Sequence, residues 1–286
     1  LNIVIEVKMG LGGYLAWTAV AREISKKLPE DTKILPCEGD GKNIHKIVRS
    51  PVFENNPLIF KEGEKTKLFP MFCNNPEANY CKDDTPLKAH HRYDKHIIEQ
   101  MCEYYDIPDP ELKCELYFSS QEEKRVQEIK NNLNEEYVVI EPYSKTNYTP
   151  NRVYPFNKWQ NIVNELSNHI QIVQVGLNTS PLLDNVVDLR SRTSFREAAL
   201  LIGGSRLFMS AEGGLVHAAT AVDTVSVVII TGYQDIKMVS YPQNINIDIS
   251  KHGPCGLKIK CDECAKEALE HNEKIILDKA LSYLIE

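Results

Sequence analysis

The chain has no run of about 18 apolar residues, the length at which a segment becomes a candidate for a membrane-spanning helix. Its first residues, LNIVIEVKMG, lack the basic stretch that opens a secretory signal peptide and favour a strand over residues 2–7. Basic residues are outnumbered, with 33 Lys and Arg against 40 Asp and Glu. The net charge of −7 argues against non-specific nucleic-acid binding, which needs a basic surface. We therefore expect a cytoplasmic protein without a nucleic-acid partner.

The sequence also shows no internal repeat and no low-complexity tract. Its 286 residues suggest two domains of ~100–200 residues each. A hydrophobic content of 42% and a charged content of 26% are typical of a soluble globular protein. There is enough apolar material for two full cores.

Strands alternate with helices along the chain. The expected strands are 2–7, 32–37, 137–141, 170–176, 207–210 and 224–231. The expected helices are 14–28, 94–105, 121–133, 157–168, 195–203, 214–222 and 265–285. Such alternation implies βαβ units and mainly parallel sheets. We expect an α/β fold with two Rossmann-like domains, residues 1–118 and 119–264, followed by a C-terminal helix over 265–286.

The most informative stretch is FMSAEGGLVHAATAV, residues 208–222, which predicts a strand, a tight glycine turn and the start of a helix. Gly213 and Gly214 carry no Cβ, so a ligand can approach their backbone closely. The free N–H groups and the dipole at the helix start favour an anion. Glu212 and His217 add an acceptor and a titratable ring. A sugar-nucleotide diphosphate suits this site, and the alternative is an ordinary βα turn.

The order of the motifs resembles glycosyltransferase family 9, the family of bacterial heptosyltransferases. Four pieces carry the resemblance, and they read VVIEPYSK…NRVYPFNKWQNIV, VVDLRSRTSFREAALLIGGSRLFMSAEGGLVHAATAV, VVIITG and KMGLGGYLAWTAVAREISKKLP. The resemblance is strongest over about 136–235 and weaker at the N-terminus.

This resemblance implies a GT-B fold, in which two Rossmann-like domains face a cleft. The second domain would hold a nucleotide-diphosphate sugar, and the first domain a glycan, lipid-linked or protein acceptor. The last helix would pack back on the first domain. By the same resemblance the donor-binding residues would be Ser144, Lys145, Arg152, Glu212, Gly213, Gly214 and His217. Negative charge develops on the departing diphosphate, and Arg152 and the helix start would stabilise it.

Members of the family invert the anomeric centre without a catalytic metal and use an acid in the first loop as the base. This chain departs from that pattern, because Gly13 occupies the position of the acid. Glu38 and Asp40 end the second predicted strand and are the alternative candidates. The enzyme could also work peripherally at the inner membrane face.

Two other function classes remain open. Gly10-x-Gly12 after the first strand, with Glu38 near the end of the second, would fit a dehydrogenase or epimerase that uses NAD. The third glycine of that motif would fall at Leu15, which weakens this hypothesis. The absent acid at Gly13 suggests a second alternative, a non-catalytic protein that binds sugar nucleotides.

Three of the eight cysteines cluster before the last helix, namely Cys255, Cys261 and Cys264. The C-x-x-C pair and one preceding thiolate could occupy three corners of a tetrahedral metal site. His252 and His271 are the nearest candidates for the fourth ligand. We expect either structural Zn or Fe, or three reduced thiols in a surface loop, and no catalytic metal.

Overall fold

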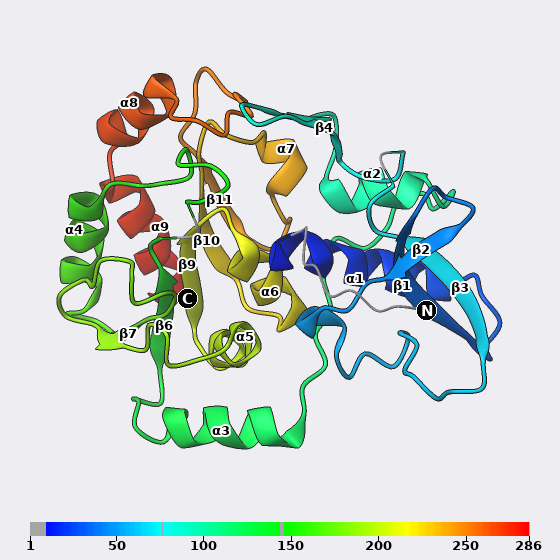
Figure 1. The fold of residues 1–286 in the computed structure, drawn as a ribbon. Coiled ribbons are helices and arrows are strands. Elements are labelled where there is room, and N and C mark those ends of the chain that lie inside the picture. Colours follow the sequence, from blue (N-terminus) through cyan, green and yellow to red (C-terminus); the bar gives the residue numbers. More distant parts are fainter. Residues whose placement is uncertain (1–9, 76, 144–145, 286) are drawn as a thin grey trace.

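The computed structural model of the chain describes residues 10–75, 77–143 and 146–285. These residues form two halves, and the helix α1 (Leu11–Ser25) of the first half packs against α6 of the second, as Figure 1 shows. The predicted strand over 2–7 lies outside the described residues. None of the described helices is long and apolar enough to cross a membrane.

A six-stranded parallel sheet forms the centre of the second half. Its strands are β6 (Tyr137–Glu141), β7 (Gln171–Gln174), β8 (Val187–Asp188), β9 (Leu207–Ala211), β10 (Ser226–Ile230) and β11 (Ile245–Asp248). They lie in the order β11-β10-β9-β6-β7-β8, and every neighbouring pair is parallel. This is the Rossmann order, and it reverses between β6 and β9. The carboxyl ends of these two strands therefore flank a crevice, where such folds bind ligands.

Helices cover both faces of this sheet. They are α4 (Phe156–Leu166), α5 (Phe195–Gly203), α6 (Gly214–Ala221), the short α7 (Ile236–Val239), α8 (Asp262–Glu270) and α9 (Lys274–Ile285). Along β6, Val138 and Ile140 pack in one hydrophobic cluster, whereas Tyr137 and Val139 pack in the other. Period-two alternation thus divides the core into an α4–α9 side and an α5–α6 side.

The prediction of one C-terminal helix that packs back on the first domain is wrong. The C-terminal segment forms two helices, and α9 packs against α4 and β10 of the second half. Ile276 and Ala280 of α9 are fully buried there. The break falls at His271, whose Nδ1 lies 2.9 Å from the Tyr154 hydroxyl and whose carbonyl accepts a hydrogen bond from Lys158. These contacts with α4 and the loop before it replace continued helical hydrogen bonding.

The described part of the first half is less regular than the predicted Rossmann-like domain. Its strands are β1 (Thr32–Gly39), β2 (Ile44–Ile47), β3 (Lys67–Phe72), β4 (Cys81–Asp84) and β5 (Ala89–His91), and its helices are α1, η1 (Pro51–Phe53) and α2 (Ile97–Glu103). β1 pairs parallel with β3 but antiparallel with β2, and β4 and β5 form an antiparallel hairpin. The crossover 40–66 contains Gly, Asn and Pro breakers, so its helical part is one 3₁₀ turn.

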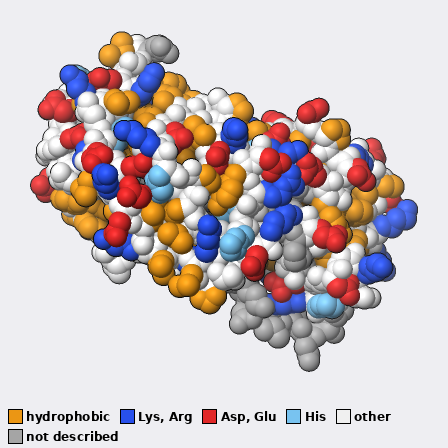
Figure 2. Space-filling view, turned by 90° about the horizontal axis from the view of Figure 1, so that it is seen from above, with side chains coloured by type: hydrophobic (Ala, Val, Ile, Leu, Met, Phe, Trp, Pro, Cys, Tyr) orange, Lys and Arg blue, Asp and Glu red, His pale blue; other side chains and the backbone are white. Residues whose placement is uncertain are grey.

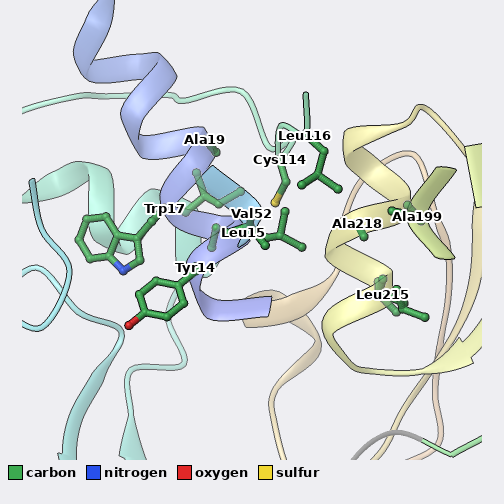
Figure 3. Packing of buried hydrophobic residues seen from close by; sticks show 14 of the residues in the cluster. Tyr14, Leu15, Trp17, Ala19, Val52, Cys114, Leu116, Ala199, Leu215 and Ala218 are labelled. Carbon is green, nitrogen blue, oxygen red and sulfur yellow. The ribbon is translucent and has the colours of Figure 1, made fainter. Parts of the chain in front are cut away.

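The two halves share one core at the contact between α1 and α6. In Figure 3, Leu15 lies on the side of α1 that faces Ala218 of α6, and Trp17 lies on the opposite side. A Cβ on Gly12 would lie 3.0 Å from the Gly214 Cα and 2.9 Å from the His217 ring. Only glycine at position 12 allows this approach, which brings the starts of both helices together.

Polar groups join the halves at a second place, below the shared core. The segment after α2 leads to α3 (Ser120–Lys130), and Arg196 at the start of α5 reaches back to it. The buried Arg196 guanidinium lies 2.5 Å from Glu122 and donates to the carbonyls of Tyr117 and Pro51. This ion pair lowers the pKa of Glu122 to about 2.

The outer surface mixes charges of both signs. Figure 2 shows acidic and basic side chains interspersed with hydrophobic ones over the face that it draws. The described residues of that face therefore form no broad basic patch of the kind that binds nucleic acids.

We predict that Arg196→Met lowers the free energy of unfolding by about 3 kcal/mol, because it leaves Glu122 and two carbonyls without their donor. Urea denaturation at neutral pH measures this loss. The control variant Arg206→Met removes an exposed ion pair with Glu136 and should lower the free energy of unfolding by less than about 1 kcal/mol. The folded-state pKa of Glu122 is lowered, so the ion-pair contribution is present at neutral pH and disappears as the pH falls towards 2. Equal stability of the two variants would contradict the prediction.

Candidate functional site

A cleft of about 830 Å³ lies between the two halves, at the carboxyl ends of β6 and β9. It brings together the predicted site residues Glu38, Arg152, Glu212, Gly213, Gly214 and His217. Ser144 and Lys145 lie outside the described residues. The cleft occupies the topological switch point of the second sheet, where parallel folds place their ligands.

Four helices start at this cleft, namely α1, α2, α5 and α6, and among the described residues α1 and α6 have no side-chain cap. Gly10 is the N-cap of α1 and Gly213 is the N-cap of α6, and both glycines line the cleft. Neither helix has a side-chain cap or an acidic residue in its first turn, whereas α2, α3 and α5 each carry a full capping box. The first N–H groups of α1 and α6 are therefore available, and both helix dipoles favour an anion here.

Arg152 supplies a cation beside these helix starts. Its guanidinium lies 4.7 Å from the centre of the Tyr233 ring, which is fully buried. Its Nη2 donates to Gln234 over 3.4 Å. Its Nε lies 3.6 Å from Glu212 Oε1, which is too far for a hydrogen bond, and it has no other partner among the described residues.

Glu212 directly follows β9 and is 3% exposed. Its Oε1 accepts a hydrogen bond from the Thr231 hydroxyl over 3.2 Å, while Oε2 has no partner among the described residues. Burial raises the pKa of Glu212 to about 7, against the opposing attraction of Arg152. This carboxyl group therefore changes its charge close to neutral pH.

His217 lies one turn into α6, and Tyr241 fixes the orientation of its ring. Its Nδ1 lies 2.6 Å from the Tyr241 hydroxyl, and the His96 ring packs edge-on against Tyr241 with 4.7 Å between ring centres. Burial, followed by the charge of Arg152, lowers the pKa of His217 to about 4. At neutral pH the ring is uncharged, and it can exchange hydrogen bonds with a ligand only through Nε2.

The first half lacks an acid in its opening loop, because Gly13 lines the cleft without a side chain. Glu38 at the end of β1 also lines the cleft. Asp40 does not line it, so this predicted catalytic candidate is not supported. Its carboxylate instead accepts hydrogen bonds from the backbone of Lys42 and Asn43 and holds the turn between β1 and β2.

The β4–β5 hairpin supplies a wall of the cleft that the sequence did not predict. His91 stacks on Tyr80 and meets Tyr233 edge-on, with its Nε2 3.4 Å from the Tyr233 hydroxyl. Tyr148 donates to Asp84 over 3.0 Å. Burial and Arg152 lower the pKa of His91 to about 4, so this wall is aromatic and neutral except at Asp84.

Glu141 is a further cleft residue that the sequence analysis missed. It ends β6, just as Glu212 follows β9, and both strands flank the switch point. The rule that ligands bind at the carboxyl ends of such strands could have found it. No comparable signal pointed to the hairpin, whose segment has weak periodicity.

The cysteine cluster lies beyond the carboxyl ends of β10 and β11, next to Gly232, and His252 completes it. The Cys255 and Cys264 sulfurs are 3.6 Å apart, and His252 Nε2 lies 3.6 Å from Cys261 and 3.7 Å from Cys264. The edges of a tetrahedron with zinc–sulfur bonds of about 2.3 Å measure about 3.8 Å, close to these spacings. His271, the other candidate, is bonded to Tyr154 at the end of α8.

The groups around the cluster also suit a metal centre. His252 directs Nδ1 to Glu267 at 2.7 Å, which leaves Nε2 to face the thiols. The hydrogen bond between the two thiols lowers the pKa of Cys255, which favours its thiolate, and raises the pKa of Cys264. The ligand atoms of His252, Cys261 and Cys264 lie within 4.8 Å of one another and Cys255 contacts Cys264, a donor set of the type that binds zinc or iron.

The loop that carries the cluster, residues 252–261, also reaches the cleft. The Cys255 N–H donates to the Gly232 carbonyl, next to Tyr233. Leu257 pairs with Lys88 of the hairpin, and its carbonyl accepts hydrogen bonds from Thr149 and Asn151. The loop therefore lies between the hairpin of the first half and the segment that carries Arg152.

Comparison with known proteins gives a family and a fold. The family model for glycosyltransferase family 9 (heptosyltransferase) matches residues 87–266, which is more than half of the chain. A search of curated protein sequences found no match.

Several solved structures share the architecture. A family 9 glycosyl transferase from Veillonella parvula superposes with a TM-score of 0.67 at 12% identity, covering 97% of this chain and 95% of that one. The Escherichia coli ADP-heptose lipopolysaccharide heptosyltransferase II has a TM-score of 0.65 at 12% identity, covering 100% and 99%. The iron-containing dodecameric heptosyltransferase TibC of enterotoxigenic E. coli, in complex with ADP-D-beta-D-heptose, has a TM-score of 0.64 at 13% identity, covering 96% and 74%. The predicted α/β GT-B fold is confirmed.

Proposed function

Because the chain belongs to glycosyltransferase family 9, we propose that it transfers a sugar from a nucleotide-diphosphate sugar to a hydroxyl group of an acceptor. The observation that carries this proposal is the pair of uncapped helix starts beside Arg152 in one cleft. The dehydrogenase alternative would use the start of α1, but it leaves Arg152 and the start of α6 in the second half without a role. TibC, of the same fold, was solved with ADP-D-beta-D-heptose, which makes a heptose or hexose donor our first candidate.

The diphosphate would bind at Arg152 and at the start of α6, with Gly213 and Gly214 allowing close approach. In the reaction, the acceptor oxygen attacks the anomeric carbon as the bond from that carbon to the diphosphate oxygen breaks. The diphosphate leaves with the electron pair, and the cation and helix N–H groups stabilise its growing charge. A single displacement of this kind inverts the anomeric centre.

A base must take the proton of the acceptor hydroxyl, and Gly13 cannot do so. We propose Glu38, since it is a carboxylate on the first-half wall of the cleft and, in contrast to Asp84, forms no ion pair with another described residue. A glycan, a lipid-linked sugar and a protein side chain are all acceptors with a suitable hydroxyl. The cytoplasmic location and the peripheral position at the inner membrane face stay predictions.

We also propose that His252, Cys255, Cys261 and Cys264 hold a structural zinc or iron ion. Four ligands would close the coordination shell, so the ion would have no open position for chemistry. TibC, which is described as iron-containing, favours iron as the first metal to test. When bound, the ion would fix the 252–261 loop against Tyr233 and the hairpin.

Arg152→Ala should weaken the binding of a nucleotide-diphosphate sugar by about 1.5–3 kcal/mol, the range for a hydrogen bond to a charged group. Isothermal titration calorimetry measures this change, and Arg206→Ala, on the surface away from the cleft, serves as the control. Unchanged affinity in a folded Arg152→Ala protein would remove Arg152 from the donor site.

Glu38→Gln should lower kcat by about 10²-fold or more while donor affinity stays unchanged, because only proton removal is lost. A radiolabelled donor can be incubated with separate glycan, lipid and protein fractions, so that the labelled product identifies the acceptor. Asp40→Asn is the matched control and should retain turnover. Full activity of Glu38→Gln would exclude Glu38 as the base, and a donor that binds without any transfer by the wild type would favour the non-catalytic alternative.

Protein purified without chelators should contain about one zinc or iron ion per chain, measured by elemental analysis. Cys261→Ser should lose the metal and lower the melting temperature, whereas Cys81→Ser, outside the cluster, should change neither. Less than about a tenth of an equivalent of metal, with all three thiols open to alkylation in the folded protein, would leave only reduced cysteines.

A further inference from the structure

The contact between Arg152 and Glu212 is incomplete on both sides. The 3.6 Å separation is an ion-pair distance without a hydrogen bond. Arg152 Nε and Glu212 Oε2 are both buried and lack partners among the described residues. Buried polar atoms normally have hydrogen-bond partners. Two neighbouring residues with unpaired buried atoms in a cleft therefore indicate a ligand that supplies a hydrogen-bond partner to each of them.

The missing ligand has a definable chemistry. It must accept a hydrogen bond from Arg152 and lie near the start of α6, so it is an anion. A carboxylate at Glu212 would repel that anion and would also compete with it for Arg152. A protonated carboxyl group would instead donate from Oε2 to an anionic oxygen.

We propose that Glu212 makes donor binding depend on protonation. The protonated carboxyl group of Glu212 binds the diphosphate of the donor, whereas its carboxylate repels the diphosphate. This inference rests on the proposed donor site. In the empty cleft the Glu212 carboxylate interacts with the positive charge of Arg152. When the diphosphate binds, it takes over this interaction, and Glu212 takes up a proton from solvent. The cleft therefore exchanges one internal anion for one external anion.

The surroundings of Glu212 support this exchange. Burial is the main reason that its pKa rises to about 7, Arg152 and the Thr231 hydroxyl oppose the rise, and Asp248 at the end of β11 adds to it. His217 of α6 lines the same cleft and is neutral, because its pKa is lowered to about 4. Glu141 of β6 is the other carboxylate on this side of the cleft. A bound diphosphate would raise the pKa of Glu212 further.

Calorimetry with a panel of ADP-glucose, UDP-glucose, GDP-mannose and dTDP-glucose tests the proposal. In these molecules the diphosphate is a diester, so the ligand itself does not titrate near neutral pH. Titrations in buffers of different ionisation enthalpy give the number of protons taken up. We expect uptake of about half a proton at pH 7 and close to one at about pH 8.5, with affinity falling about 30-fold from about pH 6 to about pH 8.5.

Glu212→Gln keeps the size of the side chain and its neutral form. This variant should bind with no proton uptake and with an affinity independent of pH, while Glu165→Gln, on the exposed side of α4, should behave as the wild type. An infrared difference spectrum of the wild type offers a second measurement that needs no variant. Donor binding should produce the carbonyl stretch of a protonated carboxylic acid.

The outcomes separate this inference from the donor site itself. If no member of the panel binds to the wild type, the proposed donor site is wrong. Binding without proton uptake, or without the new carbonyl stretch, would overturn the role of Glu212 and leave the donor site standing. Uptake that persists in Glu212→Gln would assign the proton to His217 or His91 and would also overturn it.

Discussion

The close approach of α1 to α6 is the constraint on which the site depends. Gly12 lies where any side chain would overlap the Gly214 backbone and the His217 ring. Without this contact the helix starts would separate, and the shared core between the halves would open. The absence of a Cβ at Gly12 thus allows the α1–α6 packing contact and the anion site at the two helix starts to lie at the same place.

The helices of this chain divide according to how their first turns are satisfied. α2, α3 and α5 use capping boxes built from side chains of the chain itself. The helices α1 and α6 have glycine at the N-cap, and no side chain among the described residues caps them. At the cleft, the starts of α2 and α5 are thus satisfied by side chains of the chain itself, while the starts of α1 and α6 retain hydrogen-bonding groups for a ligand. Glu212 is a side-chain example of the same arrangement, because its contact with Arg152 leaves Oε2 without a partner among the described residues.

Local patterns predicted the second half well. The strand Tyr137–Glu141 has the predicted bounds, and the capping box at Ser194 is present, since both follow from short-range rules. The break at His271 escaped prediction because contacts with Tyr154 and Lys158, distant in sequence, create it. The hairpin wall escaped for the same reason: His91 acquires its place through Tyr80 and Tyr233, not through periodicity. In the cleft, motif order located Arg152 and Glu212, but their unfinished contact is visible only in three dimensions.

The loop 252–261 has a consequence for how the molecule moves. The two halves of this chain are joined on both sides of the cleft. The α1–α6 core ties them on one side, and Leu257, bridged to Lys88 and bonded to Asn151, ties them on the other. A wide hinge motion would break backbone pairing at Leu257 and expose apolar surface at α1. The α1–α6 core and the Leu257 bridge therefore both oppose a wide separation of the two halves.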